Sequence, residues 1–132
     1  MNLNPVRAKH VHLDIELDPR FQFHYRSRGQ DGRRTCLNRG DTLTFTSADG
    51  FSIRFVKESP FEATMLESRK ESMISVREWF ATARVRHEAN DGIYPYVVAL
   101  VRDSRVFEDS PEGTPLLGDG PEIIVVTTEA YE

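Results

Sequence analysis

GDTLTFTSADGFSIRF, residues 40–55, is the stretch that decides the fold of this chain. Apolar side chains occupy alternate positions on both sides of an Ala48-Asp49-Gly50 turn signal. They are Leu43 and Phe45 before the turn, and Phe51, Ile53 and Phe55 after it. A period of two is typical of a strand with one buried face. The stretch therefore predicts a β-hairpin whose aromatic side chains point to the core.

Similar runs lie on both sides of this hairpin. HVHLDIEL (10–17) and FQFHY (21–25) alternate in the same way, and EIIVVTT (122–128) reads as the last strand. IYPYVVALV (93–101) is apolar throughout, as expected of a strand covered on both faces. Pro95 cannot donate a ladder hydrogen bond, so we expect it at a strand start or on an edge. A stretch rich in Pro, Gly and acid, residues 103–121, is expected to be a loop.

Residues 57–80 carry an ambiguous pattern. EATMLESRKE (62–71) has a composition that favours a helix, whereas alternation from Ile74 onward favours a strand. We expect a loop or one short helix within 61–72, followed by a strand from about Ser72 to His87.

The number of predicted strands indicates the fold class. About seven or eight strands with turn signals between them favour an all-β, antiparallel Greek-key sandwich. The 132 residues fit a single domain, 1–132, with an ordinary globular balance of 39% hydrophobic and 29% charged residues. The strand phases predict a buried core, whose members include Phe45, Phe51, Ile53, Tyr96 and Ile124.

Composition also narrows the class of protein. Cys36 is the only cysteine, so no intrachain disulfide is possible and nothing calls for an oxidising compartment. The first residues contain no apolar run typical of a signal peptide, and no run is long enough to cross a membrane. We therefore expect a cytoplasmic protein without a membrane partner. The formal charge of −4 counts against nucleic acid as the main partner.

The order of these motifs resembles that of the cupredoxins. RGDTLTF followed by FSIRF resembles their central hairpin, GIYPYVV their Tyr-x-Tyr strand, and PEIIVVTT their closing strand. The likeness covers roughly residues 35–128. It implies a cupredoxin-like sandwich and gives no activity by itself.

The blue-copper site of that family has no counterpart in the sequence. Such a site needs two histidines, a cysteine thiolate and a weak axial ligand. Residues 49–52 read Asp-Gly-Phe-Ser where the resemblance places the first histidine, and no Cys, His or Met follows residue 96. The resemblance therefore implies a copper-free relative, and we expect no cofactor.

Arginines are concentrated in one predicted loop. Residues 26–39 contain five of them, Arg26, Arg28, Arg33, Arg34 and Arg39, against one acid, Asp31. Arginine binds carboxylates and phosphates through paired hydrogen bonds, so this cluster is a candidate docking patch. The C-terminal third, by contrast, is acidic. Trp79, in the only tryptophan-bearing aromatic pair, is a weaker candidate anchor.

Two other kinds of chemistry are weighed against this patch. His10 and His12 share a strand face and could reach one metal, with His24 as a third ligand if the first two strands pair. Cys36 could act as a nucleophile with His24 or His87, although no catalytic signature surrounds it. Solvated histidines and a buried thiol are the simpler interpretations of these residues.

The sequence therefore predicts a non-enzymatic protein-binding or adaptor module. Its expected partner is another protein with an acidic surface, or a second copy bound through its acidic C-terminal third. The alternatives are a metal-binding protein using His10, His12 and His24, and a weak nucleic-acid binder using the Arg26 to Arg39 loop. An enzyme built on Cys36 comes last.

Overall fold

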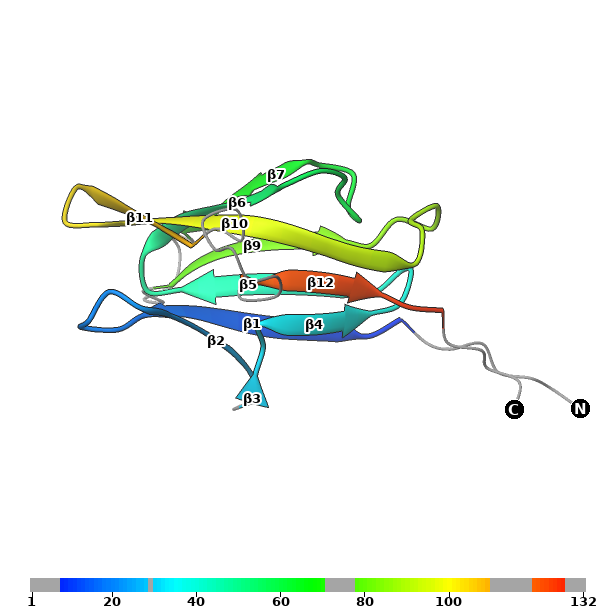
Figure 1. The fold of residues 1–132 in the computed structure, drawn as a ribbon, viewed down its shortest axis with the longest axis horizontal. Helices are drawn as coiled ribbons and strands as arrows, with labels where there is room; N and C mark the ends of the chain where they lie inside the picture. Colours follow the sequence, from blue (N-terminus) through cyan, green and yellow to red (C-terminus); the bar gives the residue numbers. More distant parts are fainter. Residues whose placement is uncertain (1–7, 29, 71–77, 110–119, 128–132) are drawn as a thin grey trace, which may run out of the picture.

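The computed structural model describes residues 8–28, 30–70, 78–109 and 120–127. In these ranges two β-sheets pack face to face, and no helix is present (Figure 1). The predicted all-β sandwich is confirmed, with short additional strands beyond the seven or eight expected. The strands are β1 (His10–Leu17), β2 (Phe23–Ser27), β3 (Gln30–Asp31), β4 (Arg34–Leu37), β5 (Thr42–Ser47), β6 (Gly50–Phe55), β7 (Met65–Glu67), β8 (Arg69–Lys70), β9 (Trp79–Arg84), β10 (Gly92–Arg102), β11 (Arg105–Asp109) and β12 (Glu122–Val125).

Both sheets are mixed rather than purely antiparallel. The first has the order β3-β2-β1-β5-β9-β8, and the second has the order β4-β12-β10-β6-β7, with β11 paired to β10. β1 pairs with β5 in parallel, and so does β12 with β4. The prediction of an antiparallel sandwich is wrong for these two pairs. The chain passes through β4, in the opposite sheet, between β1 and β5, and such a crossover allows it to return in the same direction.

The stretch 40–55 is not a hairpin. β5 pairs with β1 and β9 in one sheet, whereas β6 pairs with β10 and β7 in the other. The turn between them, where the Asp49 amide donates to Ser47 Oγ at 3.3 Å, carries the chain across the sandwich. The apolar side chains of β5 and β6 therefore pack against each other across the core, from opposite sheets. In a hairpin they would lie on one face of the same sheet.

An aromatic cluster joins the two sheets. Phe45 of β5 meets Tyr96 of β10 edge to face, with ring centroids 5.7 Å apart, and Phe55 of β6 lies 5.7 Å from the same Tyr96 ring. Edge-to-face and tilted contacts of this kind stabilise a core beyond the area they bury. The predicted burial is confirmed for Phe45, Phe51, Ile53 and Tyr96, which are all at most 5% exposed.

The predicted burial of Ile124 is wrong, because the neighbouring residues on β12 face the core instead. Ile123 and Val125 are buried, whereas Ile124 is only half-buried on the other face of β12. Because 123–126 is apolar at every position, alternation alone does not choose which face is the core.

The segment 61–70 contains two short strands and no helix, so the helix expected within 61–72 is wrong for the described residues. β7 pairs with β6, and β8 pairs with β9. Pairing with strands already in place outweighs the helix-favouring composition here. β9 begins at Trp79 and ends at Arg84; residues 71–77, the first part of the strand expected from Ser72, lie outside the described residues.

The stretch 103–121 begins with a strand, not a loop. Asp103 and Ser104 form a two-residue turn, with φ of 53° and 63°, that returns β10 into β11. A turn with positive φ at both central residues matches the twist of the paired strands. Aspartate, which stands at the first of these two positions, tolerates a positive φ. Arg102 and Arg105 flank this turn as a directly opposed pair.

Pro95 lies within β10 rather than at its start or on an edge strand. The Pro95 carbonyl accepts from Val56 N–H at 3.1 Å, and the ladder between β10 and β6 begins at Tyr96. The missing N–H of Pro95 therefore faces Val56, just beyond the end of β6, so only the last bond of this ladder is lost.

Tyr96 offers a test of the core. Its side chain is fully buried, and its hydroxyl has no hydrogen-bond partner among the described residues. Burial is the main reason that its pKa is raised far above the usual range. We expect Tyr96→Phe to keep the ring packing and raise the free energy of unfolding by about 1 kcal/mol, because a buried orphan hydroxyl is removed. Urea denaturation checks this, and a loss of more than about 1 kcal/mol would contradict it.

Candidate functional site

A groove runs from the start of β1 along β4, on one side of the sandwich. β1 and β4 belong to different sheets but lie beside each other (Figure 1). Residues of both strands, together with the β2–β3 turn, line a cavity of about 480 Å³. We call this cavity the β1–β4 groove. Its lining is Lys9, His10, Val11, Ser27, Arg28, Asp31, Gly32, Arg34, Thr35 and Cys36.

Both strands present an open edge to the groove. β2 pairs with β1 only from Asp14 onward, so residues 10–13 have a described strand partner, β5, on one side alone. β4 pairs only with β12 among the described strands. Successive residues of a strand direct their amides and carbonyls to opposite sides. The residues whose backbone groups point to the open edges are His10 and His12 on β1, and Arg34 and Cys36 on β4.

Gly32 shapes the floor of this groove. A Cβ added there would collide with Leu13 Cδ1. The amide of Gly32 donates to the Tyr25 carbonyl at 2.7 Å. The chain can therefore cross closely over β1 on its way to the other sheet only because glycine has no side chain.

The groove is predominantly basic. Lys9 and Arg28 are exposed, and their charged groups form no ion pair within the described residues. Arg34 is also exposed and donates through Nε to Glu122 Oε2 at 3.1 Å. Asp31 is the one acid in the lining. Arg28 has a φ of 53°, which L side chains rarely adopt, so the turn presents this arginine at some cost in backbone energy.

The structure divides the five arginines of the predicted patch. Only Arg28 and Arg34 line the groove. Arg26 lies on β2, with its Nε 3.5 Å from the carboxylate of Glu16. Arg33 turns to the Tyr25 ring, with its guanidinium carbon 5.4 Å from the ring centroid, and donates to the Phe23 carbonyl at 3.4 Å.

Arg39 lies in the β4–β5 turn, outside the lining of the groove. It donates to the Ala89 carbonyl, to Thr127 Oγ1 and to Asp91 Oδ1, at 2.7, 2.7 and 2.8 Å. The Thr127 hydroxyl also donates to Asp91, and this bond, ahead of the charge of Arg39, lowers the pKa of Asp91. These contacts join the β4–β5 turn to the β9–β10 turn and to the end of β12, which is a structural role.

The structure separates the three histidines proposed as metal ligands. His10 and His12 stack, with ring centroids 4.5 Å apart, and His10 Nε2 lies 2.6 Å from Thr44 Oγ1. His24 is paired in register with Glu16, four residues beyond His12 on β1, which is about 13 Å. His24 instead contacts Asp18 at 2.7 Å, which helps the Gln22 amide to lower the pKa of Asp18.

Cys36 is exposed on β4, where a buried small residue was the simpler expectation. It lines the groove together with His10, whereas neither His24 nor His87 does. The proposed pairing of Cys36 with one of those two histidines therefore has no support in this geometry.

Lys9 is the groove residue that the sequence did not single out. It lines the same cavity as Arg28 and Arg34, and its backbone amide donates to Asp41 Oδ1 at 2.9 Å, which fixes the chain just before β1. The only signal available was a basic residue directly before an alternating run. Its proximity to the β2–β3 turn depends on the pairing of β1 with β5.

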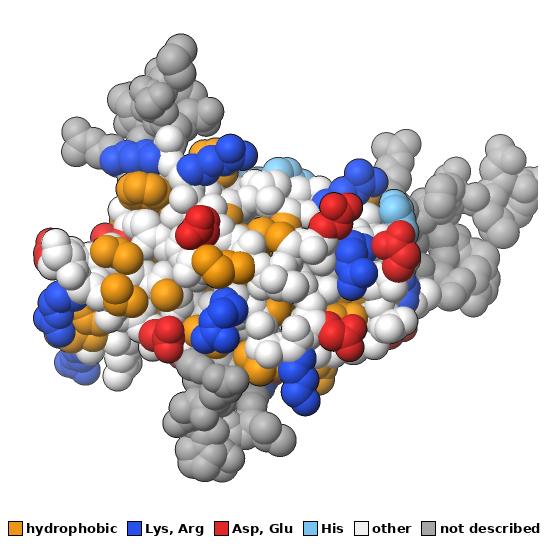
Figure 2. Space-filling model, turned by 90° about the horizontal axis from the view of Figure 1, so that it is seen from above, with side chains coloured by type: hydrophobic (Ala, Val, Ile, Leu, Met, Phe, Trp, Pro, Cys, Tyr) orange, Lys and Arg blue, Asp and Glu red, His pale blue; other side chains and the backbone are white. Residues whose placement is uncertain are grey.

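Trp79 belongs to a different hollow. It is half-buried on β9, with its ring 3.7 Å from the Cβ position of Gly50 and 5.9 Å from Lys70 Nζ. A cavity of about 710 Å³ lies beside it and also includes Val101 and Val106. On the face that is uppermost in Figure 1, hydrophobic side chains lie between charged ones of both signs (Figure 2).

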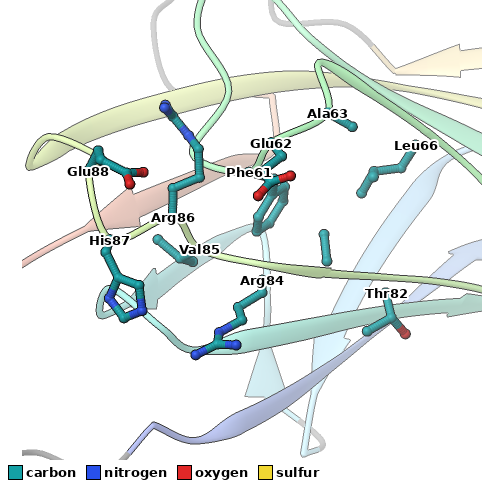
Figure 3. A pocket seen from close by; sticks show the side chains of 11 residues that line it. Phe61, Glu62, Ala63, Leu66, Thr82, Arg84, Val85, Arg86, His87 and Glu88 are labelled. Carbon is teal, nitrogen blue, oxygen red and sulfur yellow. The ribbon is translucent and has the colours of Figure 1, made fainter.

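A further cavity, of about 440 Å³, lies beside β9 and the turn after it. Figure 3 shows that its charged side chains do not converge, because Arg86 points away from Arg84 and His87. Arg86 Nη2 instead donates to the Ser59 carbonyl at 2.9 Å. This cavity therefore lacks the paired groups that acid–base chemistry requires.

The positions of a blue-copper site hold core residues. Phe51 and Val98, which stand near the missing ligands, are buried apolar side chains that face the interior. No group of three or more His, Cys, Asp or Glu side chains able to hold a metal occurs in the described ranges. The residues present do not fit copper. The same ranges contain no helix able to cross a membrane.

Comparisons with known proteins find similarity only among solved structures. No family model matches the chain, and no curated protein matches it. Its structure is similar to that of reduced rusticyanin, a cupredoxin, with a TM-score of 0.43 and 17% sequence identity. The match covers 91% of this chain and 81% of that chain. The likeness concerns the fold alone.

Proposed function

We propose that this chain is a non-enzymatic protein-binding module that receives an extended, acidic protein segment in the β1–β4 groove. The observation that carries this proposal is the meeting of two open strand edges in one predominantly basic cavity. Nothing in the groove supplies a base and a nucleophile in contact, so binding rather than catalysis is the function that its geometry supports.

The open edges favour an extended ligand. A peptide that adds to an exposed edge gains main-chain hydrogen bonds, while alternate side chains give specificity. Here the outward-pointing amides and carbonyls of His10 and His12 on β1, and of Cys36 on β4, supply the main-chain hydrogen bonds. Lys9, Arg28 and Arg34 supply the specificity, because their charges favour carboxylates at alternate positions of the ligand.

The same cations favour a protein over a nucleic acid. Three basic side chains beside Asp31, on a chain of net charge −4, form a small patch rather than the broad positive surface that a phosphate backbone requires. The stacked His10 and His12 reach no third ligand among the described residues, so the metal-binding alternative has less support.

We expect Arg28→Gly to weaken binding of a synthetic peptide with glutamate at alternate positions by about 3- to 10-fold. The loss should shrink as salt rises, because screening acts over about 8–10 Å. Stability should be unchanged or rise by up to about 1 kcal/mol, because glycine adopts a φ of 53° without strain. Fluorescence anisotropy at low and high salt measures the binding, and urea denaturation measures the stability.

Arg26→Gln is the matched control. It removes the same charge from β2, outside the groove, and should leave the affinity for the peptide nearly unchanged. Cys36 adds a positional readout, because it is the only cysteine and lies in the lining. Bound peptide should slow maleimide labelling of Cys36. Equal losses for Arg26→Gln and Arg28→Gly, or labelling that is indifferent to the peptide, would contradict the proposal. So would a preference for an oligonucleotide over the peptide.

A further inference from the structure

The outer edge of β11 is a second open edge, distant in the sequence from the groove. β11 pairs with β10 and with no other described strand. Val106 is 66% exposed, and Val101, directly opposite it on β10, is 48% exposed. An exposed edge with apolar side chains is a template for pairing with another strand.

The register of the β10–β11 hairpin shows which backbone groups are available. Arg105 is opposite Arg102 beside the two-residue turn, so Arg105, Phe107 and Asp109 direct their amides and carbonyls to β10. The amides and carbonyls of Val106 and Glu108 consequently point outward. These four groups per chain form the edge available to a partner.

The β11 sequence is complementary to a second copy of itself that runs antiparallel. In RVFED, residues 105–109, a second copy running antiparallel places Phe107 opposite Phe107, Arg105 opposite Asp109, and Val106 opposite Glu108. In this register the outward groups of Val106 and Glu108 face each other, as hydrogen bonding requires. A register centred on Glu108 would instead oppose two like charges, which is unfavourable.

We propose that two copies of this chain associate through antiparallel pairing of β11 with β11, with Phe107 at the two-fold axis. The pairing would continue the β4-β12-β10-β6-β7 sheet, through its β11 member, into the second molecule. Such an interface is isologous, so it closes at the dimer.

A hollow next to the edge suits this arrangement. Phe21, Phe23, Phe107, Arg33, Glu108 and Asp109 are among the residues around a cavity of about 360 Å³. Phe21 is 53% exposed although it stacks on Phe107, with ring centroids 5.0 Å apart. The ring of the partner's Phe107 would lie on this same face of the strand, where it would cover exposed aromatic surface.

The turn that carries Phe21 is held in place on the same side. Phe21 has a φ of 64°, and its amide donates to the Asp18 carbonyl at 2.9 Å. A bulky residue rarely occupies this conformation, and the turn is over-determined by Asp18, whose carboxylate also accepts from the amides of Arg20 and Gln22. The β1–β2 turn therefore presents an aromatic ring against Phe107 of β11.

Val106→Pro is the decisive variant. Proline removes the outward-pointing amide of Val106 and leaves the bonds between β10 and β11 intact, because edge strands tolerate proline where the N–H faces outward. We expect the chain to form a concentration-dependent dimer in sedimentation experiments, and Val106→Pro to weaken it by about tenfold or more. Val106→Thr is the control, since it keeps the amide and a β-branched side chain.

A charge-swap mixture tests the register. Arg105→Asp and Asp109→Arg should each fail to self-associate, because each sets like charges opposite one another, whereas an equimolar mixture should form a heterodimer. Circular dichroism checks folding first, because Asp109 Oδ2 accepts from the Tyr25 hydroxyl at 2.7 Å.

Three results would overturn the proposal. The first is a wild-type mass that stays at the 15.1 kDa of one chain at every soluble concentration. The second is a dimer that Val106→Pro leaves unchanged. The third is folded charge variants whose mixture does not associate. None of these substitutions lies in the β1–β4 groove, so this inference can fail while the proposed function holds, and the reverse.

Discussion

Phe45→Ala is expected to lower the free energy of unfolding by about 3–5 kcal/mol. Phe45 is fully buried in β5 and makes the edge-to-face contact with Tyr96 that joins the two sheets. Removing the ring loses the free energy gained by burying it. It also leaves a cavity, because the surrounding strands are held by their hydrogen bonds and cannot move in to fill it. Urea denaturation followed by tryptophan fluorescence measures the loss.

Ile124→Ala is the internal control for this prediction. The sequence assigned Ile124 to the core, whereas the structure leaves it half-buried on the opposite face of β12 from Ile123. We expect Ile124→Ala to cost clearly less than Phe45→Ala, at about 1–2 kcal/mol. A loss below about 1 kcal/mol at Phe45, or equal losses at both sites, would mean that the strand phases are wrong.

Alternation identified most of the strands but could not choose between a hairpin and a crossing. Residues 42–47 and 50–55 carry the apolar period of two that both arrangements require. A hairpin would place the two apolar sets on one face, and a crossing places them on facing sheets. The choice depends on pairing with β1, β9 and β10, which are distant in the sequence, and no local pattern encodes it.

The expected helix within 61–72 and the expected loop at the start of 103–121 were wrong for the described residues, because pairing with neighbouring strands outweighed local composition. EATMLESRKE has good helix formers, yet Met65–Glu67 joins the edge of β6. RVFED lies in a stretch rich in charge, and it becomes β11 because Asp103 and Ser104 accept the positive φ that a tight hairpin needs. Aspartate and serine are ordinary turn residues in many settings, so this signal was weak without the strands on both sides.

The arginine patch was predicted from sequence proximity, which strands do not preserve as spatial proximity. Arg34 and Arg39 are five residues apart but lie near opposite ends of β4, where they meet Glu122 and Asp91 respectively. Lys9 and Arg28 are nineteen residues apart and share one cavity. A candidate site on a sandwich therefore follows from which strand edges remain open, and only the sheet order supplies that.

Asp41, the second residue of the opening stretch, carries the other large expected effect. It is fully buried, and its carboxylate accepts from the Asn38 amide at 2.8 Å and the Lys9 amide at 2.9 Å. Its own backbone closes the turn, since its amide donates to the Asn38 carbonyl and its carbonyl accepts from Val85 N–H. One side chain thus joins the β4–β5 turn to the start of β1.

We expect Asp41→Asn and Asp41→Ala to lower the free energy of unfolding by about 2–4 kcal/mol, with alanine the more damaging. Asparagine keeps one acceptor oxygen, so one of the two amides loses its partner, whereas alanine orphans both. Asp31→Asn is the matched control: Asp31 is exposed, its carboxylate accepts from the Arg33 amide at 3.0 Å, and water can replace that bond at a cost below about 1 kcal/mol. Urea denaturation of the three variants checks the order. A loss for Asp41→Asn no larger than that for Asp31→Asn would show that this carboxylate does not hold Lys9 beside the groove.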